Sequence, residues 1–258
     1  MITLTTDFGL NDPYVAQMKG VIYTLNPNSK IIDITHGVDK FNICMGAFML
    51  ASVAPYFPVG TVHVAIVDPG VGTERRAIVV QTNQAFFVGP DNGILMLAAQ
   101  QQDIKHVYEL SNPKFRLPKV SHTFHGRDIF APVAAHIDSG ISVAEFGSEI
   151  TQQPLLTPKF ASIQNINGTL TGQILYVDSF GNAVTNIPSE LIQSQTVNVS
   201  LPQVVLKLAL RETYAQTNSK EAVALVGSHG FLELALNQDS FAKKYPVRTG
   251  DPVTVTFA

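Results

Sequence analysis

A change in the spacing of apolar residues near residue 150 constrains the fold more than any other feature of this chain. Before it, short apolar runs alternate with segments of helical periodicity, which is typical of a mainly parallel sheet covered by helices. After it, short apolar runs are separated by turn residues alone, which is typical of a small barrel or sandwich. The pattern predicts an α/β N-terminal domain (residues 1–153), a linker (154–167) and an all-β, barrel-like C-terminal domain (168–258).

The individual elements are expected where these runs lie. Helices are predicted at 13–25, 43–53, 94–99 and 129–137, the first with Asp12 as its cap and Pro13 as its first residue. Strands in the first half are predicted at 2–5, 30–34, 62–67, 77–81, 85–88 and 106–110, with a turn at 82–83. Strands in the second half are predicted at 169–177, 183–187, 196–200, 204–210, 222–226, 231–236 and 253–257.

The composition narrows the class of protein. The charged fraction is 14%, below the usual quarter, which favours a surface partly covered by other subunits. A net charge of −3 carries no electrostatic signature of binding to nucleic acid or to an anionic membrane. Cys44 is the single cysteine, so no internal disulfide is possible. No secretory signal is recognisable and the longest apolar stretch, 44–54, is too short to span a bilayer, so a soluble cytoplasmic protein is expected.

Four polar loops of the first half carry candidate chemistry, namely those at Asp7, His36, Asp68 and His125. The first three follow predicted strands, and ligands of open α/β sheets bind at the carboxyl ends of the strands. With Arg75, the Asp68 loop and His125 supply a carboxylate, a guanidinium and an imidazole, a set suited to activating water. The imidazole would take a proton, the carboxylate would hold its tautomer and the guanidinium would stabilise hydroxide. Taken singly, each of these features also has a purely structural interpretation. The Asp68 loop would be a glycine-rich turn, Arg75 a surface ion-pair partner and His125 a helix cap.

Two turns of the second half are further candidates. Residues 178–182 read as an ordinary hairpin turn, or as an aromatic face beside an amide that would suit a planar base. Residues 228–230 form a turn before the strand that contains Glu233. This carboxylate lies in an otherwise apolar strand and would need a cationic partner if it faced inward.

Taken together, five segments resemble one known family. They are Thr6–Gly9, Asp68–Arg76, Gly89–Gly93, Phe124–Asp128 and Asp178–Asn182, in this order along the chain. They are similar to those of the S-adenosyl-L-methionine hydroxide adenosyltransferases, or adenosylmethionine hydrolases, which are grouped with the fluorinases and chlorinases. The similarity extends from Ile2 to about Gln238.

The resemblance implies both an architecture and a reaction. It implies an α/β domain, a β-barrel-like domain and a homotrimer whose sites lie between the N-terminal domain of one subunit and the C-terminal domain of the next. Water or hydroxide would attack C5′ of the ribose of S-adenosylmethionine, releasing methionine and adenosine. No metal and no separate cofactor are expected.

The resemblance also assigns roles to residues. It implies that Asp68, Arg75 and His125 activate the water. It implies that the substrate-binding residues are Asp7 at the ribose, Phe41 against the nucleoside, Phe180 and Asn182 at the adenine, Asp178 at the methionine amine, Ser228 at the methionine carboxylate, and Glu233 nearby. One position departs from the halogenase pattern, because His229 stands where those enzymes have an arginine for the carboxylate.

Three other functions stay open. A nucleoside halogenase is disfavoured, because halide-using relatives have tyrosine at the position of Asp68 and serine or glycine at that of Gly126, whereas a desolvated carboxylate would repel a halide. A metal-dependent hydrolase would use Asp7, His36, Asp68 and His125, but it lacks close ligand spacing. A non-catalytic protein that binds S-adenosylmethionine or adenosine would not require the water-activating residues.

Overall fold

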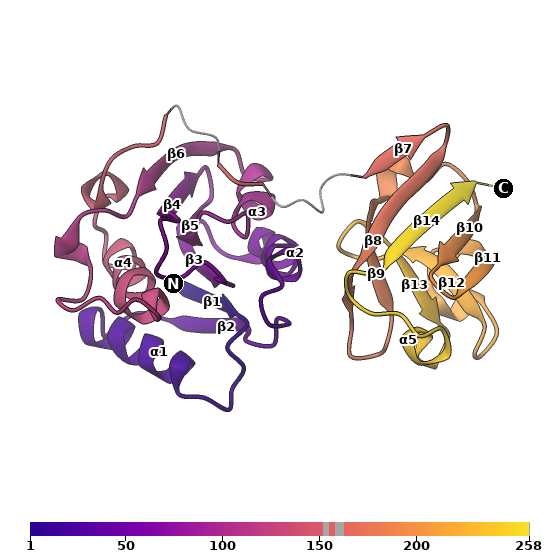
Figure 1. The fold of residues 1–258 in the computed structure, drawn as a ribbon, viewed down its shortest axis with the longest axis horizontal. Helices are drawn as coiled ribbons and strands as arrows, with labels where there is room; N and C mark the ends of the chain where they lie inside the picture. Colours follow the sequence, from indigo (N-terminus) through magenta and orange to yellow (C-terminus); the bar gives the residue numbers. More distant parts are fainter. Residues whose placement is uncertain (152–154, 158–162, 258) are drawn as a thin grey trace. The chain divides into compact units, whose positions relative to one another are not determined.

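The computed structural model describes residues 1–151, 155–157 and 163–257. The chain forms two compact units, Met1–Pro158 and Lys159–Ala258, hereafter the N-terminal and C-terminal units (Figure 1). Of the predicted linker, residues 154 and 158–162 lie outside the described residues, as does the predicted domain end at residue 153. Within the same range, Gln164–Ile166 forms strand β7.

The N-terminal unit has the predicted α/β architecture. Its six-stranded sheet has the order β2-β1-β3-β5-β4-β6, within the part of the chain that the structure describes. The strands are β1 (Ile2–Thr6), β2 (Ile31–Thr35), β3 (Thr61–Ile66), β4 (Ala77–Thr82), β5 (Ala85–Pro90) and β6 (Ile104–Glu109). The pairings β1–β2, β1–β3 and β3–β5 are parallel, which confirms a mainly parallel sheet.

Strand β4 is antiparallel to both its neighbours, β5 and β6. The short turn after it explains this, since a parallel partner would need a long crossover. Thr82 closes the turn, because its Oγ1 accepts hydrogen bonds from the backbone N–H groups of Gln84 at 3.2 Å and Ala85 at 2.9 Å.

Helices cover both faces of this sheet. Helices α1 (Tyr14–Leu25) and α4 (Ala131–Asp138) contact each other on one face, and α2 (Ile43–Val53) and α3 (Met96–Gln100) contact each other on the other (Figure 1). Helix α1 starts one residue later than expected. Pro13 takes the N-cap position without a side-chain hydrogen bond, so the prediction that Asp12 caps this helix is wrong.

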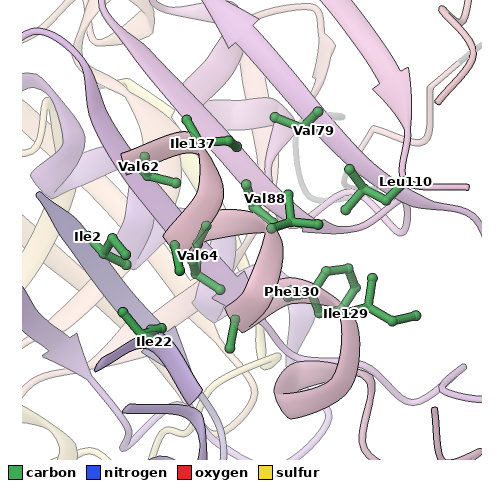
Figure 2. Packing of buried hydrophobic residues seen from close by; sticks show 14 of the residues in the cluster. Ile2, Ile22, Val62, Val64, Val79, Val88, Leu110, Ile129, Phe130 and Ile137 are labelled. Atoms are coloured by element: carbon green, nitrogen blue, oxygen red, sulfur yellow. The ribbon is translucent and has the colours of Figure 1, made fainter. Parts of the chain in front are cut away.

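The core beneath α1 and α4 holds the strand ends in place. Side chains from α1 and from the turn just before α4 interleave with those of the central strands, as Ile22, Phe130, Val62 and Val64 show in Figure 2. Each of these four side chains is completely buried. Burying one such side chain contributes about 1.5–3 kcal/mol, so the strands that end beside Asp7 and Asp68 form a rigid base.

The C-terminal unit is a closed barrel, in agreement with the prediction. Its strands are β8 (Thr169–Val177), β9 (Ala183–Pro188), β10 (Thr196–Leu201), β11 (Val204–Arg211), β12 (Ala222–Val226), β13 (Phe231–Leu236) and β14 (Pro252–Phe257). They follow the order β14-β10-β11-β12-β13-β9-β8, and pairing of β8 with β14 closes the ring, with β7 alongside β8. Most pairs are antiparallel, and β11–β12 is parallel. The interior is apolar, with Ile174, Val199 and Leu234 fully buried.

Short helical turns complete both units. They are η1 (Ala54–Tyr56), η2 (Pro113–Phe115), η3 (Gly126–Phe130), η4 (Val143–Phe146), η6 (Ser189–Leu191), η7 (Tyr214–Gln216) and the short helix α5 (Phe241–Lys244). Across the described ranges, every helix is too short or too polar to span a lipid bilayer.

Candidate active site

A cavity of about 640 Å³ lies at the carboxyl ends of β1 and β3 in the N-terminal unit. Four predicted residues line it: Asp7, Phe41, Asp68 and His125. Their loops are far apart in sequence but meet here because β1 and β3 are parallel neighbours. The loops at Asp7, Asp68 and His125 therefore meet at this edge of the sheet.

Arg75 joins Asp68 and His125 into one hydrogen-bonded cluster. Its Nε lies 3.0 Å from Asp68 Oδ1 and 3.1 Å from Oδ2, and its Nη2 lies 2.5 Å from Oδ2. The same Nη2 lies 2.8 Å from His125 Nδ1. Both members of the ion pair are largely buried, with side-chain exposures of 10% for Arg75 and 6% for Asp68. The carboxylate and the imidazole thus face the cavity, and the guanidinium braces both.

The contact with Arg75 defines the protonation of His125. A guanidinium has only donors, so His125 Nδ1 must accept and the ring proton must be on Nε2. Burial, and then the positive charge of Arg75, lower the pKa of His125 below its ordinary value. The imidazole is therefore neutral near pH 7 and offers an N–H group. The sequence analysis gave the control of this tautomer to the Asp68 carboxylate, but Arg75 makes the contact.

The loop that carries Asp68 and Arg75 is held from two sides. Asn92, in the turn after β5, donates its side-chain Nδ2–H to the carbonyl of Val67 at 2.8 Å. In the same turn Asp91 pairs with Arg76, whose Nε lies 2.9 Å from Asp91 Oδ2. The segment Gly89–Gly93, which the family resemblance included, thus stabilises the loop that carries Asp68 and Arg75 and lies outside the cavity lining.

Gly72 allows this loop to contact the loop that precedes His125. It has φ +78°, and a Cβ atom at this position would lie 2.2 Å from the carbonyl oxygen of His122. Glycine accepts this backbone conformation at little cost, and it leaves room for the neighbouring main chain. The two loops that supply Asp68 and His125 are therefore in direct backbone contact.

His125 precedes a turn of π-helix, η3, where the sequence predicted an ordinary loop and helix start. The turn is anchored by Asp128, which is fully buried and accepts hydrogen bonds from Arg127 Nε at 2.6 Å and the backbone N–H of Ser121 at 2.8 Å. Burial would raise the pKa of Asp128, but these hydrogen bonds outweigh it and hold the pKa below its ordinary value. Single π-turns are frequent at functional sites because they redirect a side chain.

Asp7 and Phe41 meet at another part of the cavity lining. The backbone N–H of Phe41 donates to Asp7 Oδ2 at 3.0 Å, and Lys40 Nζ donates to the Asp7 carbonyl. Phe41 has φ +64°, a strained conformation for a residue with a side chain, and its ring is 69% exposed. Asp7 therefore keeps one carboxylate oxygen for a ligand and holds an exposed aromatic ring beside it.

Sequence reasoning missed an aromatic cluster on the cavity wall. Tyr14 and Phe124 have ring centroids 5.2 Å apart, and Phe8 lies 5.8 Å from each. Phe8 and Phe124 lie within the segments Thr6–Gly9 and Phe124–Asp128 that resemble the family. Their aromatic side chains were the signal from which this cluster could have been predicted. Gln17 and Arg127 also line the cavity, 2.9 Å apart between Oε1 and Nη1, and no local pattern distinguished Gln17.

A second cavity, of about 660 Å³, lies in the C-terminal unit and is lined by Asp178, Phe180, Asn182 and Tyr214 among others. Asp178 organises its own hairpin turn. Its Oδ1 accepts from the backbone N–H groups of Phe180 at 2.9 Å and Asn182 at 2.8 Å, and its Oδ2 accepts from the Asn182 side chain at 3.0 Å. Phe180 is left 77% exposed at the tip of the turn. The turn thus presents an aromatic face, as the sequence suggested.

Glu233 is buried at 5% exposure and does face inward. Its Oε1 accepts from the Tyr214 hydroxyl at 2.7 Å, and its Oε2 lies 3.3 Å from His229 Nε2. His229 Nδ1 accepts the backbone N–H of Phe231 at 3.2 Å, so the ring proton is on Nε2 and points to Glu233. Burial and the Glu233 carboxylate raise the pKa of Tyr214. Ser228 is exposed in the turn before them.

The remaining candidate, His36, is buried behind the Asp7 loop and does not line the cavity. Its Nδ1 lies 2.8 Å from Thr6 Oγ1. Among the residues that the structure describes, no three His, Cys, Asp or Glu side chains are grouped as a metal site would require. The predicted residues that line a cavity therefore fall into two groups, Asp7, Phe41, Asp68 and His125 in the N-terminal unit and Asp178, Phe180 and Asn182 in the C-terminal unit.

Comparison with known proteins defines the family. The family models for the SAM hydroxide adenosyltransferase N-terminal and C-terminal domains match residues 2–147 and 172–254, where SAM is S-adenosyl-L-methionine. The chain is 37% identical to the (R)-S-adenosyl-L-methionine hydrolase of Salinispora arenicola, over 99% of this chain and 97% of the relative. It is 33% identical to the protein of the same name from Methanocaldococcus jannaschii, over 100% and 96%.

More distant relatives and solved structures agree. A fluorinase of Actinoplanes is 26% identical over 100% of this chain and 98% of the relative. The crystal structure of an uncharacterized conserved protein from Thermotoga maritima superposes with a TM-score of 0.91 at 36% identity, covering 99% of this chain and 100% of that one. Because both family models and full-length relatives above 30% identity match, the chain belongs to the SAM hydroxide adenosyltransferase family.

Proposed function

We propose that this protein is an enzyme that hydrolyses S-adenosyl-L-methionine to adenosine and L-methionine. The observation that carries the proposal is the Asp68–Arg75–His125 cluster on the wall of a cavity. The hydrolases named among the relatives support the same substrate and reaction. The sulfonium is already a good leaving group, so the protein has mainly to position and activate water, and no metal or separate cofactor is required.

The reaction is a displacement at C5′ of the ribose. The water oxygen forms a bond to C5′ while the bond from C5′ to sulfur breaks, and the sulfur keeps the electron pair as methionine leaves. The water proton passes to Asp68 and not, as the sequence had suggested, to His125, because His125 Nδ1 already accepts from Arg75. Asp68 Oδ1 accepts one hydrogen bond from Arg75 and retains a second lone pair. The Nε2–H of His125 donates to the reacting oxygen and, with the Arg75 charge, stabilises the negative charge that develops there.

The other predicted residues bind the substrate in this proposal. Asp7 accepts hydrogen bonds from the ribose hydroxyls with its free Oδ1, and Phe41 packs on the nucleoside. Phe180 and Asn182 bind the adenine, supported by their shared cavity, and Asp178 binds the methionine amine.

The methionine carboxylate is assigned to Ser228. His229 does not replace the arginine of the halogenases, because one of its nitrogens accepts a backbone N–H and the other faces Glu233. Glu233 acts indirectly, because its side chain is buried and its two oxygens contact Tyr214 and His229.

We also propose that the active protein is a homotrimer in which each site combines the Asp68 cluster of one subunit with the Asp178 turn of the next. The division of the candidate residues between two units, and the low charged fraction of 14%, support this assembly. Cytoplasmic location is proposed as well, because S-adenosylmethionine is a substrate of the cell interior. Light scattering would measure the assembly, and a fully active monomer would contradict shared sites.

A halogenase is the second candidate, and the position of Asp68 argues against it. The carboxylate lines the cavity where a halide would have to be desolvated, and like charges repel strongly there. Incubation of the purified protein with S-adenosylmethionine, a chelator and chloride or fluoride tests all candidates in one chromatogram. Adenosine with methionine supports the hydrolase, a 5′-halogenated nucleoside supports the halogenase, and binding without either product supports a non-catalytic protein.

A further inference from the structure

His36 is a candidate residue that the proposed reaction leaves unused. It follows β2 directly, and it is 5% exposed although it carries a polar ring. A buried imidazole is costly unless its nitrogens have partners. Its partners show what it stabilises.

The partners of His36 are the residues on either side of Asp7. The hydroxyl of Thr6 accepts the backbone N–H of Phe8 at 3.2 Å, and the same Oγ1 lies 2.8 Å from His36 Nδ1. The Thr6 hydroxyl proton is thus available to His36 Nδ1. The carbonyl of His36 accepts the backbone N–H of Gly9 at 2.8 Å. One residue therefore restrains the turn before and after Asp7.

An ion pair on the surface orients the His36 ring. With Nδ1 as an acceptor, the proton is on Nε2, which lies 3.0 Å from Asp33 Oδ1 in a contact too bent for a regular hydrogen bond. Asp33 in turn pairs with Lys19 of α1 at 2.6 Å. Burial would raise the pKa of Asp33, but the hydrogen bond from Lys19 and the contact with His36 keep it lowered. The carboxylate stays charged and favours the Nε2–H tautomer.

We propose that His36 is a positioning residue for ribose recognition, acting through Thr6 on the carboxylate of Asp7. The inference rests on the proposed function, in which Asp7 binds the ribose hydroxyls. Asp7 Oδ2 is taken by the backbone N–H of Phe41, so only Oδ1 remains, and its direction depends on the turn that His36 holds. Loss of the contact between His36 and Thr6 should therefore weaken the discrimination between ribose and deoxyribose.

The experiment measures the Kd values of adenosine, 2′-deoxyadenosine and 3′-deoxyadenosine by calorimetry on the full-length protein. The unmodified protein should bind adenosine about 10- to 100-fold more tightly than either deoxyadenosine, because each deoxynucleoside lacks one hydrogen bond to the charged Asp7. His36→Phe, which removes both ring nitrogens, should bring the preference to within about 3-fold of unity. His36→Asn, whose Oδ1 can occupy the place of Nδ1, should retain most of it. If His36 had a merely structural role, His36→Phe would weaken the binding of all three nucleosides equally.

Three further variants keep the result unambiguous. Thr6→Val breaks the same contact from the other side with little change in volume, and it serves if His36→Phe does not fold. His106→Gln is a matched control, because this histidine lies on β6, is exposed and pairs with Glu149. Asp7→Asn is the reference. If it abolishes the preference while His36→Phe and Thr6→Val keep it, the role of His36 is refuted. If Asp7→Asn keeps the preference, the ribose role of Asp7 fails and the inference with it.

Discussion

The two clusters of candidate residues are built differently. In the N-terminal unit, Asp68 and Arg75 come from one loop and His125 comes from another that is distant in sequence, and the ion pair between Asp68 and Arg75 is largely buried. In the C-terminal unit, the turn from Asp178 to Asn182 is held by hydrogen bonds within five residues, and its aromatic tip is exposed. The first arrangement suits chemistry, which needs desolvated and fixed charges, and the second suits recognition of a flat apolar ligand.

The largest expected effect separates chemistry from binding. Asp68→Ala removes the proposed proton acceptor and leaves Arg75 without its carboxylate, so kcat should fall about 10²- to 10⁴-fold. Steady-state kinetics with S-adenosylmethionine would measure it. A near-normal kcat would show that Asp68 is not part of the water-activating group.

Acid should destabilise the N-terminal unit selectively. His63 on β3 is fully buried, with its ring stacked on Phe87, and burial lowers its pKa to about 4 from the ordinary 6.5. Between these two pH values only the unfolded chain binds the proton. The contribution of neutral His63 to the free energy of unfolding is therefore complete above pH 6.5 and is lost as the pH falls towards 4. The loss should reach about 3 kcal/mol in the free energy of unfolding. Denaturant titrations at pH 7 and pH 4.5 would measure it, and an equal loss in His63→Gln would contradict the assignment.

A single methyl group should test the contact between the two catalytic loops. Gly72→Ala places a Cβ against the carbonyl of His122, so the loops must separate and both kcat and Tm should fall. Gly140→Ala is the matched control, because its φ is +95° but no atom lies within 4 Å of the added Cβ. The control should show only backbone strain, about 1–2 kcal/mol, with kcat unchanged. Equal kcat in the two variants would mean that the contact does not position Asp68 and His125.

The pH dependence of turnover should report the state of His125. Protonation at Nδ1 would break its contact with Arg75, and the pKa of His125 is lowered by burial and by Arg75. The neutral form therefore predominates down to below the ordinary value of about 6.5, and kcat should fall only at lower pH. His125→Asn should remove this acidic limb. A limb centred above pH 6.5 would contradict a neutral His125 held by Arg75.

The smallest effect is expected at the recognition turn. Asn182→Ala removes the proposed contact to the adenine, which would be made in both the ground state and the transition state, so KM should rise about 3- to 30-fold with kcat nearly unchanged. The comparison with Asp68→Ala uses the same assay. A collapse of kcat in Asn182→Ala would place chemistry in the C-terminal unit and reverse the comparison.

Local patterns were sufficient for much of the fold. The strands of the barrel lie within one or two residues of the apolar runs that predicted them, because alternation and turn residues are properties of neighbouring positions. The same holds for the helix 43–53 and for the hairpin between 77–81 and 85–88. The Asp12 cap failed because Pro13 itself occupies the N-cap position, one residue later than expected.

The amino-acid sequence by itself determined the residue types of the site, their order and their family. The tertiary structure decided how they work together. Three features depend on contacts between residues 30 to 50 positions apart. Arg75 rather than Asp68 contacts His125, Gly72 lies against the carbonyl of His122, and His36 contacts Thr6 next to Asp7. Such contacts are set by which parallel strands become neighbours and by the directions of buried side chains. No local spacing encodes either of these, so the geometry of this site could be obtained only from the folded chain.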